Sequence, residues 1–345
     1  MAVLTRAGSA TRSRRLGVWL LLILVLLGVM ILVGIAVGSR ELGIGEVWRA
    51  LTGGGDIEAR AIVLEQRVPR TVVAVLAGAA LAVAGVIMQG HTRNPLADPG
   101  LLGVTAGSSL LVVLAIGFLG LSDPSGYLWF AFGGAAAGAT AVVTIGLMAA
   151  GRRDSSPATL VLAGSAVSAF LSAITGIVLL LDESTLEVFR FWTVGSLSGG
   201  RDLSALVPAI IAVVVGLVIA LSHGSTLDAL ALGDDVARSL GRSLALSRVV
   251  GLLSVTLLVG GAVALVGSIG FVGLIAPHIV RLVVGESHRW LLPFSALVGA
   301  ILVISADVIG RVVVRPDEIS VGVVLAVVGA PAFLLIVLRM RRSRR

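Results

Sequence analysis

Few side chains in this sequence could do chemistry in apolar surroundings, and the clearest pair is Asp307 and Arg311. Asp307 lies in an otherwise apolar stretch. A carboxylate in such a stretch is by default a candidate proton or ion site. Arg311 follows four residues later, which places both side chains on one face of a helix. We therefore predict a structural ion pair near the end of this helix, in preference to a proton-transfer site.

The four histidines do not form a ligand pattern. His91, His223 and His288 stand singly, and no pair has the spacing of a metal site. His278 follows Pro277 and is predicted to pack or to cap a helix rather than to bind metal. The sequence therefore predicts no metal site and no cofactor on this chain.

The composition of the basic residues excludes one large class of enzyme. All 26 are arginine, and the chain has no lysine and no cysteine. A Walker A loop needs its lysine to reach the nucleotide phosphates, so an ordinary P-loop ATPase site is excluded. Cysteine nucleophiles, disulfides and zinc–thiolate sites are excluded as well. A membrane enzyme would need clustered histidine, aspartate or glutamate facing one cavity, and the apolar stretches offer almost none.

The longest polar interruption on one side of the apolar stretches, Ser225 to Arg248, is a candidate contact surface. Leucine and valine recur in it at intervals of three to six residues, with charged residues between them. This pattern predicts a short pair of amphipathic helices, broken near Gly233 and Gly241. About two to eight residues suffice to join two helices, so we interpret the segment as a docking element for a partner. The alternative is an oversized surface loop.

The composition also indicates a membrane protein. Of the 345 residues, 57% are hydrophobic and 13% are charged. The first apolar stretch, Leu16 to Val37, is 22 residues long, which exceeds the apolar core of a cleaved signal peptide and suits a span. We predict an all-α polytopic fold with ten transmembrane helices. They cover residues 16–37, 70–90, 100–120, 127–150, 158–181, 204–222, 249–268, 270–284, 290–310 and 320–338.

An even number of spans places both termini on one side of the membrane. Seventeen of the 26 arginines lie in segments on that side, so the positive-inside rule predicts cytoplasmic termini. The same arginines explain the net charge of +7 without nucleic acid. The whole chain, 1–345, is then one transmembrane domain, with cytoplasmic basic tails at 1–15 and 339–345 and the cytoplasmic polar element at 225–248.

An internal similarity points to two related halves. Leu76 to Ile87 aligns with Leu258 to Ile269 without a gap, and six of the twelve positions are identical. These stretches belong to the second and seventh predicted spans. An odd offset of five spans makes the two copies point in opposite directions, which is an inverted repeat of two five-helix halves. This architecture is commoner in transporters than in enzymes.

Four segments together resemble the FecCD-type permease family, over a region from about residue 16 to the C-terminus. They are RVPR through NPLADPGLLG between 67 and 103, GFVGLIAPHIVRLV at 270–283, ADVIGR at 306–311 and ISVGVVLAVVGAPAFLLIVLR at 319–339. The resemblance implies a type II ABC importer permease. It implies two permease subunits around one pathway, an extracytoplasmic binding protein above them and two ATPase subunits below.

The resemblance also implies roles for particular residues. The family's coupling helices fall between spans six and seven, where the predicted ATPase contact comprises Asp234, Asp235, Arg238, Leu240, Gly241 and Arg242. Exposed arginines of the RxPR and ADxxxR elements, here Arg67, Arg70 and Arg311, would meet acidic residues of the binding protein. Arg60 and Arg315 are neighbours that could substitute. The alternative for Arg67 and Arg70 is that they anchor a span at the lipid headgroups.

Pathway residues follow from the same resemblance. Leu96 would help to close the pathway toward the cytoplasm, with Ser156, Pro157 and Ala158 as a counterpart. Ordinary turn chemistry explains these positions equally well. Trp192 lies in a predicted short external helix near the pathway mouth, or serves as an aromatic anchor at the membrane interface.

We therefore expect a permease subunit in the bacterial cytoplasmic membrane that imports a ferric siderophore by alternating access. It would not be an enzyme, because ATP and Mg²⁺ would be held by separate ATPase subunits. The same machine carrying cobalamin or heme is the alternative. An ion-coupled secondary transporter is a more distant one, because it would need polar residues at mid-membrane.

Overall fold

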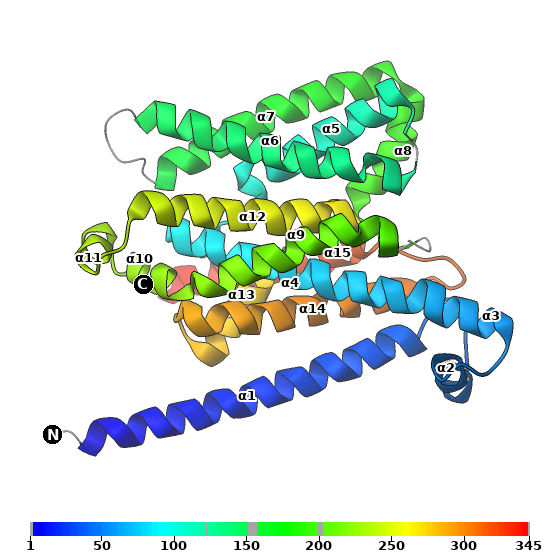
Figure 1. Ribbon diagram of the computed structural model, residues 1–345, viewed down its shortest axis with the longest axis horizontal. Coiled ribbons are helices and arrows are strands. Elements are labelled where there is room, and N and C mark those ends of the chain that lie inside the picture. Colours follow the sequence, from blue (N-terminus) through cyan, green and yellow to red (C-terminus); the bar gives the residue numbers. More distant parts are fainter. Residues whose placement is uncertain (1–2, 122, 151–156, 199–202, 344–345) are drawn as a thin grey trace.

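The computed structural model describes residues 3–121, 123–150, 157–198 and 203–343, and all regular structure in these ranges is helical. Most of the chain forms a bundle of long helices whose axes run in roughly the same direction (Figure 1). Ten of the helices match the ten predicted spans. They are α1 (Val3–Ala36), α4 (Val68–Thr92), α5 (Val104–Leu119), α6 (Pro124–Ala150), α7 (Pro157–Leu181), α9 (Leu203–Ser222), α12 (Leu244–Val266), α13 (Val272–Val284), α14 (His288–Val313) and α15 (Val321–Ser343).

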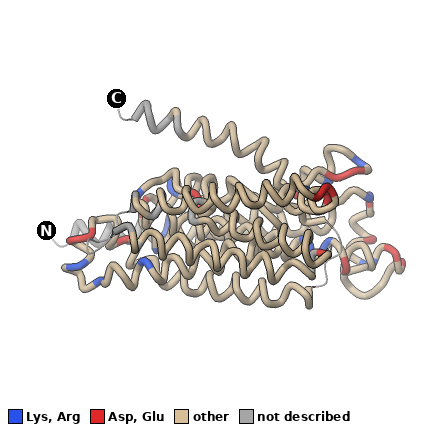
Figure 2. The backbone as a smooth tube through the Cα atoms, turned by 90° about the horizontal axis from the view of Figure 1, so that it is seen from above, with Lys and Arg blue, Asp and Glu red and all other residues tan. Residues whose placement is uncertain are grey.

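Length and apolar composition show that this is a multi-pass membrane protein. Within the described ranges, seven helical segments are long and apolar enough to cross a bilayer. Three further apolar helical segments are shorter: Val104–Leu119, Val272–Val284 and Val321–Ile336. Charged residues gather at the two ends of the bundle, and the middle is almost free of them (Figure 2). That distribution suits a bundle whose middle lies in hydrocarbon, where an unpaired charge is costly.

The two ends of the bundle carry different short helices. Both chain termini lie at one end, together with α10 (Gly224–Ala231) and α11 (Asp234–Ser239) (Figure 1). We call this the terminal end. The opposite end carries α2 (Ile44–Leu51), α3 (Ile57–Arg60), the π-helical turn η1 (Ala61–Arg67) and α8 (Glu183–Val194). A 3₁₀ turn, η2 (Pro99–Leu102), precedes α5.

Helix α4 is the centre of the packing. It is buried over most of its length and packs against α12, α13 and α14. Glycines make these contacts close: a Cβ added at Gly78 would lie 2.3 Å from the Gly299 carbonyl oxygen, and one at Gly85 would lie 1.9 Å from that of Gly273. Small residues that let backbones approach are the usual means of helix association in lipid, where apolar side chains gain little by leaving the solvent.

The aligned segments of the internal repeat are neighbours in space. Helix α4 contains the first segment and α12 contains the second as far as Val266. These two helices pack against each other and run in opposite directions (Figure 1). This is the geometry expected of an inverted repeat. Two other helices lie at the edge: α1 is apolar and largely exposed, and the C-terminal part of α15 diverges from the bundle (Figure 2).

The glycine contacts of α4 lead to a stability prediction. Replacing Gly85 with alanine should lower the apparent Tm in detergent, because the new Cβ meets a backbone oxygen that only a helix shift can move. We expect a loss of about 1–3 kcal/mol, as for other overpacked sites. Gly28→Ala is the matched control, since nothing lies within 4 Å of a Cβ at that position of α1. Equal Tm values for the two variants would contradict this packing.

Candidate functional site

The polar element of the terminal end is a pair of short helices, as the sequence predicted. Helices α10 and α11 are separated at Gly233, which has a φ of 115°, and α11 is followed by Gly241, with a φ of 75°. These left-handed conformations strongly favour glycine. The buried residues Leu227, Leu230 and Ala237 hold the pair against the bundle.

Five of the six residues predicted to contact an ATPase are presented to the outside. The Asp235 side chain is 98% exposed and pairs with Arg238 at 3.2 Å. Leu240 is 60% exposed, and Gly241 and Arg242 are exposed beside it. We call Asp235, Arg238, Leu240, Gly241 and Arg242 the outer face. It combines charge with an unpartnered apolar side chain, which suits contact with another protein.

Asp234, the sixth residue, differs from the others because its carboxylate turns toward the bundle. It accepts a hydrogen bond from the Arg93 guanidinium and lies 3.7 Å from Nη2 of Arg248. Arg93 caps the end of α4 in a left-handed conformation and also donates from Nε to the Leu230 carbonyl at 2.9 Å. Asp234 therefore joins the element to two spanning helices.

A second carboxylate, which the sequence did not single out, joins α10 to α14. Asp228 accepts from the backbone N–H of His288 at 2.6 Å and lies 3.0 Å from its Nδ1. It also accepts from the Ser287 hydroxyl at 3.2 Å. A carboxylate at a helix N-terminus satisfies an otherwise unpaired N–H and interacts favourably with the helix dipole. No local spacing marks this contact, because Asp228 and His288 are 60 positions apart.

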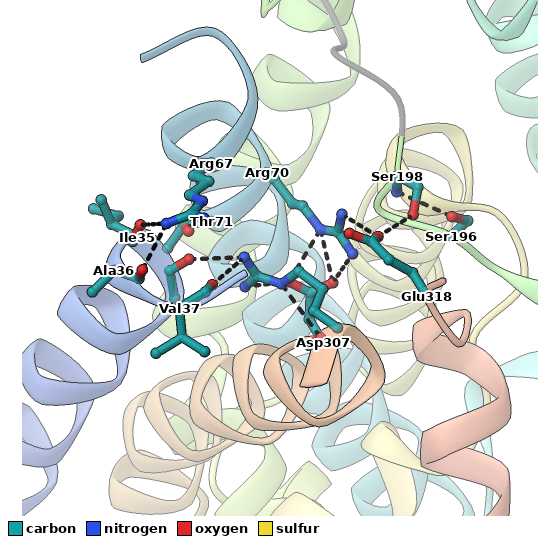
Figure 3. A network of polar contacts seen from close by, with 12 residues as sticks. Ile35, Ala36, Val37, Arg67, Arg70, Thr71, Ser196, Ser198, Asp307 and Glu318 are labelled. Carbon is teal, nitrogen blue, oxygen red and sulfur yellow. Dashed lines mark hydrogen bonds and ion pairs between the residues drawn. The ribbon is translucent and has the colours of Figure 1, made fainter. Parts of the chain in front are cut away.

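At the opposite end, Asp307 holds two arginines from different parts of the chain (Figure 3). Arg70 donates to it from Nε and Nη2 at 2.9 and 2.7 Å, and Nη2 of Arg311 lies 2.8 Å away. Arg70 also donates to Glu318 at 2.7 Å, and Glu318 accepts from Ser198 at 3.1 Å. The predicted structural pair of Asp307 with Arg311 is confirmed, and it is part of a larger network.

Two arginines at this end bind carbonyls in the last turn of α1 and at Val37, the residue that follows it. Arg67 donates to the Ile35 and Ala36 oxygens at 3.1 and 2.6 Å (Figure 3). Arg311 donates to the Gly34 and Val37 oxygens at 3.0 and 2.8 Å. The last four carbonyls of a helix lack intrahelical partners, so cationic donors are well placed there. These contacts tie an otherwise peripheral helix to α4 and α14.

The expectation that Arg67, Arg70 and Arg311 are exposed is therefore wrong. Arg67 is 5% and Arg311 is 2% exposed, and the Arg70 side chain is 13% exposed. Their guanidinium groups serve internal contacts because buried charges need partners. Arg67 and Arg70 are for the same reason not headgroup anchors. The neighbours Arg60 and Arg315 are exposed, and Arg315 pairs with Glu41 at 2.5 Å.

A cavity of about 390 Å³ opens beside this network. Its charged lining consists of Arg40, Glu58, Arg67, Arg70, Arg311 and Glu318. Glu318 stands outside the spans; burial would raise its pKa, but the hydrogen bond and charge of Arg70 outweigh this and lower it. The carboxylate is thus held ionised, and the site is suited to charge pairing rather than to proton exchange.

The predicted gate residues fall in different settings. Leu96 donates its N–H to the Asn94 side chain at 3.0 Å, and Asp98 accepts from the Gly100 N–H at 2.8 Å, so ordinary turn chemistry does operate here. Pro157 and Ala158 begin α7, and Ser156 lies outside the described residues. Trp192 is buried in α8 and stacks on Phe189, so it is not an exposed interface anchor.

The segment GFVGLIAPHIVR has a packing role that its sequence did not reveal. Gly273 lies against Gly85 of α4, and its carbonyl accepts from the Gln89 side chain at 3.2 Å. Arg281 then donates to the Gln89 amide oxygen at 2.6 Å. The buried amide is thereby satisfied on both sides, which joins α13 to α4.

The histidines are not all isolated, contrary to the sequence expectation. The His91 and His223 rings stack with centroids 5.7 Å apart, and His223 contacts the Ser247 hydroxyl at 3.0 Å. Sequence separation hid this pair, since the residues come from α4 and from the turn after α9. Within the described ranges, no three histidine, aspartate or glutamate side chains form a group that could hold a metal ion.

Comparison with known proteins places these features in a family context. A family model described as the FecCD transport family matches residues 22–339. The chain is 40% identical to the ferric enterobactin transport system permease protein FepD of Escherichia coli, over 98% of this chain and 99% of that protein. It is 38% identical to the hemin transport system permease protein HmuU of Yersinia pestis, over 93% and 96% of the two chains.

A solved structure supports the same comparison. It is described as an inward-facing conformation of a metal-chelate type ABC transporter. It superposes with a TM-score of 0.80 at 29% identity, covering 95% of this chain and 99% of that chain.

The network around Asp307 predicts a large cost for losing Arg311. Arg311→Met should lower stability by about 3–5 kcal/mol, because it leaves a buried carboxylate short of one partner and frees two carbonyls of α1. Arg315→Met, at an exposed ion pair, should change it by about 1 kcal/mol or less. Thermal unfolding in detergent measures both, and similar Tm values would contradict the assignment.

Glu318 makes the stability of this end depend on pH. Because its pKa is lowered in the folded chain, its contribution is present above the ordinary value of 4.5 and is lost as pH falls through the folded value. At pH 7, Glu318→Gln should lower the free energy of unfolding by about 1–2 kcal/mol. The reason is that Arg70 would then donate to a neutral amide oxygen instead of a carboxylate. The Tm difference from wild type should shrink below pH 4.5. Exposed Glu65→Gln is the control, and a difference that does not vary with pH would refute this role.

Proposed function

Because the chain belongs to the FecCD transport family, we propose that it is the permease subunit of an ABC importer that carries a ferric siderophore across the cytoplasmic membrane. The observation that carries the proposal is the 40% identity to a ferric enterobactin permease over nearly the whole of both chains. The helical bundle and its likeness to a metal-chelate transporter agree with it. The permease would change the cargo's location and not its covalent structure.

The terminal end would face the cytoplasm, and the outer face of α11 would receive an ATPase subunit. The positive-inside distribution of arginine supports this orientation. The absence of lysine supports separate ATPase subunits that hold ATP and Mg²⁺, because this chain cannot form a Walker A loop. The exposed Arg238 and Leu240 supply the charged and apolar contacts that such a partner would cover.

The opposite end would receive an extracytoplasmic binding protein. Acidic residues of that partner would meet the exposed Arg60 and Arg315 first, because a rim charge mainly steers association. Arg70 lines the cavity beside them and is the most accessible of the three buried arginines. Arg67 and Arg311 would act beneath this surface by holding α1 in place.

A second permease subunit, identical or paralogous, would complete the pathway. The C-terminal part of α15 diverges from the bundle (Figure 2). The helix exposes apolar side chains that include Val323, Val327 and Leu334. A second copy would cover such a surface. Leu96, Ser156, Pro157, Ala158 and Trp192 remain the proposed pathway or gate residues, and alternating access would move the two subunits around them.

One structural observation argues against ion-coupled secondary transport. Asp307 is the only acidic candidate named for a proton site, and its carboxylate is already paired with Arg70 and Arg311. Protonating it would remove the carboxylate charge paired with the buried Arg311 and would leave Arg70 with Glu318 alone. The hemin permease at 38% identity keeps heme as an alternative cargo, and cobalamin is a third cargo to test.

Uptake measurements in cells with and without the gene test this proposal. The probes are ferric enterobactin, a ferric hydroxamate siderophore and ferric citrate carrying radioactive iron, with labelled heme and cobalamin for comparison. We expect that cells without the gene selectively lose uptake of a ferric siderophore. Loss of only heme or cobalamin uptake would overturn the proposed cargo. Unchanged uptake of every probe would overturn the proposal that the chain belongs to an importer.

Copurification of the ATPase tests the cytoplasmic surface. Arg238→Glu should abolish it, and Arg190→Glu should not. The control is matched, because both arginines are exposed and pair with a carboxylate three residues earlier, but they lie at opposite ends of the bundle. Equal retention of the ATPase would refute the outer face as its contact surface.

A further inference from the structure

The α10–α11 element is fastened to the bundle by two carboxylates that point away from its outer face. Asp228 on α10 binds the N-terminus of α14 through the His288 backbone N–H at 2.6 Å. Asp234, at the start of α11, pairs with Arg93 at the end of α4 and with Arg248 near the start of α12. Charge-assisted hydrogen bonds of this kind are directional as well as strong.

The geometry differs from that of a loop that merely covers the bundle. Arg93 binds the end of α10 through the Leu230 carbonyl and the start of α11 through Asp234, so it spans the break at Gly233. Gly224 of α10 also packs closely against α14, since a Cβ there would lie 3.1 Å from the Arg289 Cα. A displacement of α10 and α11 would therefore pull directly on α4, α12 and α14.

The helices held in this way are also joined at the far end of the bundle. Arg70 of α4 pairs with Asp307 of α14, and both helices pack through Gly78 and Gly299 midway. Helices α4 and α14 are thus connected at the terminal end, in the middle and at the opposite end. Coupling between distant sites requires such a physical connection, in which rigid elements move together.

We propose that Asp228 and Asp234 are positioning residues that transmit movement of the α10–α11 element to α4, α12 and α14. This inference rests on the proposed function, because it assigns the outer face to an ATPase. Two adjacent aspartates of α11 have different surroundings. The Asp235 side chain is exposed on the outer face, whereas Asp234 pairs with Arg93 of the bundle.

The complete transporter, with its ATPase and binding protein in proteoliposomes, provides the test. The readout is the number of radioactive ferric siderophore molecules transported per ATP hydrolysed, using a siderophore that the wild type transports from the uptake panel. Asp234→Asn and Asp228→Asn should each lower this ratio about tenfold, a typical size for a coupling free energy between sites. A purely structural defect would lower transport and hydrolysis together and leave the ratio unchanged.

A charge exchange separates pairing from other effects of substitution. Arg93→Asp combined with Asp234→Arg should recover a large part of the ratio that either single variant loses, even if one of the single variants assembles poorly. Asp123→Asn, at an exposed aspartate outside the α10–α11 element and its outer face, is the matched control and should keep the wild-type ratio.

Each outcome decides one of the two proposals. A wild-type ratio in both asparagine variants, or a charge exchange no better than the single variants, would overturn the transmission role. A wild-type complex that hydrolyses ATP but transports none of the siderophores would instead overturn the proposed function.

Discussion

The ion pairs of the Asp307 carboxylate are the interaction on which the end of the bundle opposite the termini depends. This carboxylate is 2% exposed and pairs with both Arg70 of α4 and Arg311 of α14. A buried charge without a partner is very costly, so neither arginine could occupy its place alone. Their pairing also leaves Arg311 free to bind the carbonyls of α1, and Arg70 free to bind Glu318 before α15. One carboxylate thus sets the positions of four helices.

Carboxylates with long-range partners also hold the terminal end together, but there they lie on short helices rather than on a spanning helix. There the carboxylates Asp228 and Asp234 come from the short helices, and the donors come from the spanning helices. Between the two ends, the described part of the bundle carries almost no charge to define the register of the helices, and close glycine contacts along α4 take over that role (Figure 2). The relative positions of the helices are therefore fixed by ionic contacts at the ends of the bundle and by close backbone contacts in its middle. That arrangement allows rigid helices to carry movement from one end to the other.

The family relationship and the local structure assign different tasks to the motif arginines. The RxPR and ADxxxR elements resemble family sequences that are expected to contact a binding protein. In this chain, however, Arg67 and Arg311 donate to backbone carbonyls at the end of α1. In this chain, Arg67 and Arg311 of these motifs hold the end of α1 in place. Arg60 and Arg315 are exposed at the same end, and they are the side chains that the proposed binding protein would reach first.

The length and apolar character of the stretches determined the ten helices, and their even number determined the shared side of the termini. The spacing of leucine and valine between charged residues, with glycines at the breaks, determined the helix pair at α10 and α11. All of these are local properties of the chain. The Asp307–Arg311 pair was also predictable, since four residues of helix bring the side chains together. Only the tertiary structure decided that Arg67 is buried, that His91 meets His223, and that Asp228 caps α14. The contacts of Arg67 with the end of α1, of Asp228 with His288 and of His91 with His223 join residues 31 to 132 positions apart. Which distant groups satisfy a buried charge depends on how the helices pack.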